Sequence, residues 1–245
     1  MEGTFLVLAG FGAGAINAIA GGGPLLTLAA LTAAGIDPRI VNLTSTVALS
    51  PGQLIAGWQS RSGLALLGQA GHSRLLALLA SCLSGGLGAA LLVATESAQF
   101  SAIVPWLVLL ATGLYAWSGR GRATGSRHGI GRAAFAANLV LSAIYGGYFG
   151  GGNSFVVLAL LALAGLPGPA GAEAKNALIA SINLGAVAVF VASGAVDWHA
   201  AIAVGAGGIA GSIAGVRLLR RIRPALLRPV IIACGLGLAG WFFAS

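Results

Sequence analysis

The sequence has little charge. Only 7% of its 245 residues are charged, whereas a soluble domain carries about 25%. In contrast, 58% are hydrophobic, and apolar stretches of the ~20 residues needed to cross a bilayer recur along the chain. This composition excludes a soluble protein and also a soluble domain with a single anchor. It predicts an all-α, polytopic integral membrane protein.

Cysteine and buried acid are scarce as well. The two cysteines, Cys82 and Cys234, lie in apolar segments, where cysteine usually serves as a small core residue. No Asp, Glu or His falls in the middle of an apolar stretch, and no Cys or His spacing is typical of a metal site. Membrane enzymes need acid–base or metal groups, so we expect no enzyme activity, no metal and no cofactor. The same absence argues against a pump driven through a buried carboxylate and leaves the coupling open.

Two glycine triplets interrupt the apolar sequence. Gly21–Gly23 is followed by Pro24, and Gly150–Gly152 is followed by Asn153 and Ser154. Glycine triplets break helices because glycine loses the most backbone freedom on ordering. Pro24 fits the first turn of a new helix, and Asn153 and Ser154 are expected to cap another. Each triplet therefore predicts a broken helix inside the membrane.

The helices after the two breaks are short. Residues 24–35 and 153–165 give 12 and 13 residues, or about 18 Å of helix at 1.5 Å per residue, against a ~30 Å hydrocarbon core. We expect each to form a hairpin with the segment before it, at residues 3–20 and 133–149. The first segment has the length of a signal peptide, but it lacks a preceding basic region, so we expect it to be retained.

The other segments complete a repeat. Full spans are expected at residues 40–59, 75–95, 100–118, 174–193, 199–216 and 229–243, which gives about eight transmembrane helices in all. Expected loops cover residues 61–74, 96–99 and 166–173. Each half has the order break, short helix, polar helix and a helix with a small-xxx-small pattern that favours close packing. We therefore expect a first repeat at 1–118, a basic linker at 119–132 and a second repeat at 133–245.

The basic residues set the expected orientation. The net charge is +8, but the basic residues lie in loops between spans, which indicates membrane topology rather than nucleic-acid binding. If the basic loops are cytoplasmic, all of the 13 Lys and Arg residues except Arg39 lie inside. The first hairpin then opens to the outside and the second to the inside. The two halves form inverted repeats, which is the plan of a secondary transporter.

This arrangement predicts an anion site. A helix that begins inside a membrane presents unpaired N–H groups and partial positive charge, and glycines let a ligand approach them. Neutral hydrogen-bond donors suit a transported anion because binding must permit release. The candidate substrate-binding residues are Asn17, Gly21, Gly22, Gly23, Pro24, Thr27, Asn42, Thr44, Ser45, Thr46, Gly150, Gly151, Gly152, Asn153, Ser154, Lys175, Asn176, Ser181 and Asn183.

Each of these residues also has a structural interpretation. Glycine triplets can serve helix packing alone, and membrane-embedded Ser and Thr hydroxyls usually bond to their own helix. Lys175, the only lysine, either extends to the cytoplasmic surface or attracts anions at a gate. The basic linker is expected to contact anionic lipid.

The motifs resemble one known family. The stretches GAGAINAIAGGGPLLTLAALTAAGI and NLTSTVAL in the first half are similar to the TauE/SafE sulfite exporters. GGYFGGGNSFVVLALLALAGL, AKNALIASINLGAVAVFVASGAVDW and GSIAGVRLLRRI resemble the family's second repeat. The resemblance covers essentially the whole chain. It implies a multi-pass inner-membrane transporter of small sulfur-containing anions, such as sulfite, sulfonates like sulfoacetate, or thiosulfate.

We therefore expect alternating access around an anion site near the membrane midplane. Two alternatives stay open at this point: a channel-like facilitator of another small solute, and a non-transporting accessory protein whose glycines only pack helices. A homo-oligomer is also left open. The exact substrate, the direction of transport and the coupling ion do not follow from the sequence.

Overall fold

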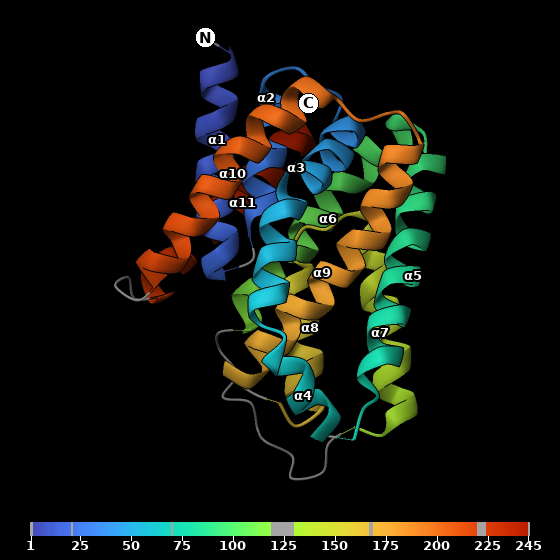
Figure 1. Cartoon of the computed structure of the whole chain (residues 1–245). Coiled ribbons are helices and arrows are strands. Elements are labelled where there is room, and N and C mark those ends of the chain that lie inside the picture. The colour runs from blue at the N-terminus through green and yellow to red at the C-terminus, as the bar shows by residue number, and fades with distance from the viewer. Residues whose placement is uncertain are drawn as a thin grey trace.

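The computed structural model describes residues 2–20, 22–69, 71–118, 130–166, 169–219 and 224–244. Within these ranges the chain forms eleven α-helices and no strand, which confirms the all-α prediction (Figure 1). The helices are α1 (Glu2–Ala20), α2 (Gly23–Ala33), α3 (Pro38–Gln59), α4 (Ser62–Gln69), α5 (Arg74–Ala94), α6 (Ser97–Ser118), α7 (Arg132–Tyr148), α8 (Asn153–Leu163), α9 (Pro169–Ala192), α10 (Trp198–Leu219) and α11 (Pro224–Ala244).

The two short helices fold back on the helices before them. α1 and α2 form a hairpin whose outer ends lie at the top of Figure 1. α7 and α8 form a second hairpin with outer ends at the opposite end of the molecule, where Ile130 N–H donates to the Leu163 carbonyl at 3.0 Å. α2 and α8 have 11 residues each, a rise of about 16 Å. Their inner ends therefore lie near mid-height.

Several boundaries differ from the sequence-based expectation, and α11 begins at Pro224 rather than at residue 229. The expected loop at 61–74 contains α4, because Leu67 is fully buried in the cluster formed with α9. α9 begins at Pro169, so Glu173 lies in a helix, where it accepts a 2.8 Å hydrogen bond from the Ser62 hydroxyl. α6 begins at Ser97, which shortens the expected turn at 96–99. Of the expected linker at 119–132, residues 119–129 lie outside the described residues.

Glycine brings α1 and α10 into backbone contact. A Cβ atom added to Gly14 would lie 2.1 Å from the Gly208 carbonyl oxygen, and one added to Gly211 would lie 1.9 Å from that of Phe11. Real Cβ atoms do not approach so closely, so only glycine allows this helix pair to pack as it does. The small-xxx-small pattern around Gly211 is thus a packing feature.

The pair α5 and α7 repeats this contact, and like α1 and α10 it joins one helix from each half of the chain. A Cβ atom on Gly147 would lie 1.9 Å from the Gly85 carbonyl oxygen, and one on Gly88 would lie 2.1 Å from that of Ile144. The two contacts on each helix are three residues apart, as they are in α1 and α10. The two helix pairs therefore cross with the same local geometry.

α3 and α9 meet at the centre of the molecule. They pack against each other, and each also packs against one helix of the glycine-linked pairs: α3 on α10 and α9 on α5. Within the described residues, α5 and residues 171–192 of α9 are long and apolar enough to cross a membrane, with mean hydropathies of 2.1 and 1.6. Shorter apolar helices include Gly23–Ala33 and Asn153–Leu163.

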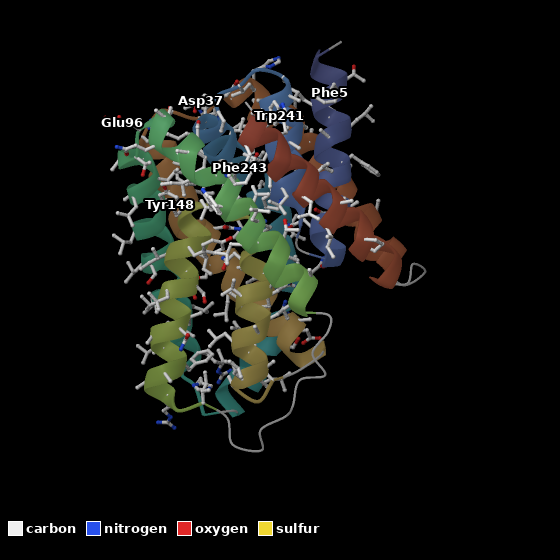
Figure 2. The ribbon with its side chains drawn as sticks, turned by 180° about the vertical axis from the view of Figure 1, so that it is seen from behind. Phe5, Asp37, Glu96, Tyr148, Trp241 and Phe243 are labelled. Atoms are coloured by element: carbon white, nitrogen blue, oxygen red, sulfur yellow. The ribbon has the colours of Figure 1, made fainter. Side chains whose placement is uncertain are left out.

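The two ends of the molecule differ in charge. Figure 2 shows Asp37 and Glu96 together at one end, where the Asp37 carboxylate accepts the N–H groups of Arg39 and Ile40 and caps α3. The opposite end carries α4 (Figure 1) and its flanking basic residues, Arg61 and Arg74. The ends therefore follow the charge division expected from the sequence.

Candidate functional site

A small cavity lies where the inner ends of the two hairpins meet α3 and α9. Its volume is about 20 Å³, enough for roughly one water-sized atom group. Eight of the predicted residues line it: Asn17, Pro24, Ser45, Thr46, Gly150, Asn153, Ser154 and Asn183. Leu49, Gln53 and Ile179 complete the wall. The structure thus gathers residues from both breaks and both polar helices around one point.

A larger cavity continues from this point towards the α4 end. Its volume is about 390 Å³, and it shares Asn17, Gln53, Ser154 and Ile179 with the small cavity. Lys175 and Asn176 of α9 also line it, together with Gln59 and Ser60 at the end of α3. Ile55, Ala56, Ile209 and Ile213 form an apolar wall, and Gly52 and Ser212 complete the lining.

Three polar atoms at the small cavity have no partner. Ser45 Oγ, Gln53 Oε1 and Asn153 Oδ1 are buried and form no hydrogen bond with the described residues. Ser45 and Asn153 are only 2% and 3% exposed. An unpaired buried polar group costs about 1–3 kcal/mol, and such groups usually have a functional explanation. The Ser45 hydroxyl can donate to a ligand oxygen, whereas the Gln53 and Asn153 amide oxygens accept and need a hydrogen-bond donor.

Glycine shapes the start of α8. Gly150 and Gly152 have φ angles of +73°, which residues with side chains rarely adopt, and Gly152 caps the helix. The Tyr145 hydroxyl donates to the Gly151 carbonyl at 2.6 Å and holds this turn in place. The expectation that Asn153 and its neighbour cap the helix is wrong: no side chain caps α8. A left-handed glycine supplies the turn, and this frees Asn153 to face the cavity.

The start of α2 is built differently. Gly22 precedes the helix with a φ angle of −94°, and Pro24 occupies its first turn, as expected. A Cβ atom on Gly23 would lie 2.6 Å from the Asn17 Cβ, so the glycine lets Asn17 pack against the helix start. Gly21 lies outside the described residues. The two breaks are therefore alike in position but not in backbone conformation.

Four predicted residues bind protein groups instead of lining a cavity. Thr27 Oγ1 donates to the Pro24 carbonyl at 3.0 Å, and Ser181 Oγ to the Leu78 carbonyl at 2.8 Å. Asn42 Nδ2 donates to the Tyr148 carbonyl at 2.8 Å, and Thr44 Oγ1 accepts the Asp197 N–H at 3.1 Å. Their observed contacts are structural, and a role in binding substrate stays a prediction. Gly22, Gly23, Gly151 and Gly152 shape the site without lining the two cavities.

Several lining residues were absent from the predicted set. Gln53 follows Pro51 in the polar stretch of α3, so the sequence showed a polar side chain but not that it faces the cavity. Ser60 accepts a 3.0 Å hydrogen bond from Asn176 Nδ2, and this bond joins the end of α3 to α9 at the cavity. Ser212 lies beside Gly211, in a segment that the sequence indicated only as a helix-packing motif. Polar residues within spans are the signal that would have identified Gln53 and Ser212.

Lys175 is the only charged side chain lining either cavity, as far as the described residues show. Among the same residues, no three His, Cys, Asp or Glu side chains are grouped closely enough to hold a metal ion. The deep part of the site therefore offers amides, hydroxyls and helix N-termini, and its wider part offers one ammonium. This combination suits a small anion with hydrogen-bond acceptors.

Comparison with known proteins identifies a family of membrane transporters. The family model described as Sulfite exporter TauE/SafE matches residues 6–242. The "Probable membrane transporter protein ORF9" of Sinorhizobium sp. is 32% identical, over 96% of this chain and 90% of its own. A "Probable membrane transporter protein" of Haemophilus influenzae is 29% identical over 94% and 89% of the two chains. The "Probable membrane transporter protein YfcA" of Escherichia coli is 30% identical over 90% and 81%. No solved structure matches significantly.

Proposed function

The chain belongs to the sulfite exporter TauE/SafE family, and we propose that it transports small sulfur-containing anions across the cell inner membrane. Sulfite, sulfonates such as sulfoacetate, and thiosulfate are the candidate substrates. The observation that carries the proposal is the small cavity at the junction of two broken helices, lined by amides and hydroxyls that include the unpaired Ser45 hydroxyl. The donors among these groups, the Ser45 hydroxyl and the side-chain amide N–H groups, would bind the anion's oxygens there without a fixed positive charge.

The chemistry of the deep site favours release as well as binding. Asn17, Asn153 and Asn183 present neutral amides, and Ser45 and Ser154 present hydroxyls. A buried arginine would hold a desolvated anion far more tightly, because charge-assisted hydrogen bonds are roughly twice as strong as neutral ones. A transported ion must bind weakly enough to leave. Neutral groups are therefore consistent with transport.

We further propose inverted repeats and alternating access. The two hairpins open at opposite ends of the molecule (Figure 1), and the glycine contacts of α1 with α10 recur between α7 and α5. Inverted repeats of this kind place a substrate site at the midplane, between broken helices. The large cavity extends from that site towards the α4 end, which the basic residues assign to the cytoplasm. This conformation then corresponds to the inward-open state.

Two hydrogen bonds link helices on the proposed outer side of the site. Arg39 Nη2 donates to the Val93 carbonyl at 3.1 Å, and the Tyr148 hydroxyl donates to Thr95 Oγ1 at 3.3 Å. A cavity on one side of the site, with hydrogen-bonded helices on the other, supports a transporter over an open channel.

Ligand binding to the purified protein tests the proposal. In detergent, sulfite, sulfoacetate or thiosulfate should raise the melting temperature in a concentration-dependent way, because a ligand that binds only the folded state stabilises it. Sodium chloride and sodium acetate at equal ionic strength are the controls. The proposal fails if none of the three sulfur anions stabilises the protein more than these salts do.

A further inference from the structure

Arg39 lies at the outer end of the molecule with its side chain only partly satisfied. It occupies the first turn of α3, beside Asp37 and close to the end of α5. Nη2 donates to the Val93 carbonyl, but Nε is buried and has no hydrogen-bond partner among the described residues. Asp37, the neighbouring acid, is occupied in capping α3. An unpaired guanidinium N–H is costly because it is a charged donor.

The contacts of α3 and α9 indicate which helix ends correspond in the two halves. Gly205 of α10 lies against α3, with its Cβ position 3.2 Å from the Ala48 carbonyl oxygen. Gly185 of α9 lies against α5, with its Cβ position 1.9 Å from the Cys82 carbonyl oxygen. Since α10 corresponds to α5 under the proposed inverted repeats, these contacts match α3 with α9. The start of α3 and the start of α9 lie at opposite ends of the molecule (Figure 1).

This match sets the first turn of α3, which carries Arg39, against the beginning of α9. Lys175 and Asn176, in the second turn of α9, line the mouth of the large cavity. Arg39 therefore lies, in the first half, at the end of α3 that corresponds to the cavity-mouth end of α9. In the present conformation this outer mouth is closed, and the Arg39 guanidinium rests on the last turn of α5.

We propose that Arg39 is the anion-binding residue at the outer mouth of the transport path. The inference rests on the proposed function, because an outer mouth exists only if the two halves exchange conformations. When the outer end opens, Nε and one Nη of Arg39 would bind two oxygens of an oxyanion, a geometry that guanidinium matches and ammonium does not. The ligand class is a sulfur oxyanion, and Lys175 serves the inner mouth.

The test measures transport separately from each face. Right-side-out and inside-out membrane vesicles are prepared from cells that produce the full chain, and uptake of ³⁵S-labelled sulfite is measured against its concentration. Vesicles from cells without the chain give the background. The variants are Arg39→Gln, Arg39→Lys and, as a matched control, Arg74→Gln, which removes an exposed arginine at the other end of the molecule.

Arg39→Gln should raise the half-saturating sulfite concentration about tenfold in right-side-out vesicles, which corresponds to about 1.4 kcal/mol. In inside-out vesicles the half-saturating concentration should change by less than about twofold, since the inner mouth is intact. Arg39→Lys should give an intermediate effect on the outer side only, because it keeps the charge but loses the paired N–H geometry. Arg74→Gln should match the wild type on both sides.

Two results would overturn the inference, and they are distinguishable. If the wild type takes up sulfite and Arg39→Gln alters both faces equally or neither, Arg39 is not an outer binding residue and the proposed function stands. If the wild type takes up no sulfite from either face, transport of sulfite is itself refuted and the inference falls with it. If Arg39→Gln does not fold, Arg39→Lys replaces it: a higher half-saturating sulfite concentration on the outer side alone supports the inference, and an equal effect on both faces or on neither contradicts it.

Discussion

The side-chain amide of Asn42 donates a 2.8 Å hydrogen bond to the backbone carbonyl of Tyr148. Asn42 lies in the polar stretch of α3, and Tyr148 is the last residue of α7. The last carbonyls of a helix lack partners within the helix, so this bond satisfies a group that would otherwise be buried and unpaired. It also fixes the end of α7, immediately before the glycine break, to the opposite half of the protein.

Asn42→Ala should therefore destabilise the protein by about 1–3 kcal/mol, the usual cost of leaving a buried polar group unpaired. Thermal unfolding in detergent, followed by tryptophan fluorescence, measures the change. Asn138→Ala is the control, because the Asn138 amide bonds within its own helix at an exposed position. Equal melting temperatures for the wild type and Asn42→Ala would show that the bond contributes nothing.

Ser45 provides a test that separates binding from stability. Its hydroxyl is buried beside the small cavity and unpaired, so Ser45→Ala should leave the stability unchanged or raise it by up to about 1 kcal/mol. Sulfite affinity should fall by roughly fivefold or more, the effect of losing one net hydrogen bond to a ligand. Titration of the melting temperature with sulfite measures both quantities.

Ser81 is the matched control for Ser45. Its hydroxyl is also buried and unpaired, but it lies in α5 and lines neither cavity. Ser81→Ala should have the same small effect on stability and none on sulfite affinity. Equal affinities for the two alanine variants would contradict the assignment of the small cavity as the binding site.

A substitution at Gly146 tests whether sulfite binding requires the present position of the Asn153 side chain. A Cβ atom on Gly146 would lie 1.9 Å from Asn153 Nδ2, so Gly146→Ala forces the amide out of its present position at the cavity. We expect loss of sulfite binding with the fold retained, because the clash falls on a side chain rather than on backbone. Gly113→Ala, where a Cβ atom meets nothing within 4 Å, should bind sulfite normally and gain up to about 1 kcal/mol of helix stability. Normal binding by Gly146→Ala would show that the Asn153 amide is not a ligand group.

Much of the site could be predicted because it depends on local backbone chemistry. Glycine triplets break helices wherever they occur, so α2, α8 and the residues beside the breaks followed from the sequence. The directions of Asn42, Thr44 and Ser181 did not, because their partners come from distant segments: Tyr148, Asp197 and Leu78. A helix pattern shows that a residue is polar, but only tertiary packing decides whether it faces a cavity or a neighbouring carbonyl.

The boundaries that were wrong have a similar cause. α4 has only eight residues, too few to form an isolated helix in water, and it is stabilised by the burial of Leu67 against α9. The left-handed Gly152 replaced the expected side-chain cap of α8. For α4 the deciding factor is a tertiary contact. For α8 it is the φ angle of a glycine, which the sequence does not determine.

His72 should make stability depend on pH. It is buried in the turn between α4 and α5 and stacks on Phe135, with ring centroids 4.0 Å apart. Burial, and secondarily the charge of Arg132, lower its pKa from the usual 6.5. The unfolded chain therefore binds the proton more readily, so stability is full above about pH 6.5 and falls as the pH drops towards the folded-state pKa.

Melting temperatures measured from pH 8 to pH 5 test this expectation. The decline below about pH 6.5 should be smaller in His72→Phe, which keeps an aromatic ring against Phe135 but cannot be protonated. His199→Gln, at an exposed position, should decline as the wild type does. An identical acid profile for His72→Phe and the wild type would show that His72 does not control the acid response.

Flux of ³⁵S-labelled sulfite through proteoliposomes containing the purified chain tests the central claim most directly. We predict saturable uptake above that of protein-free liposomes, competition by sulfoacetate or thiosulfate, and loss of uptake in Gly146→Ala but not in Gly113→Ala. Uptake no faster than in protein-free liposomes, for sulfite and for both competitors when labelled in turn, would contradict the account.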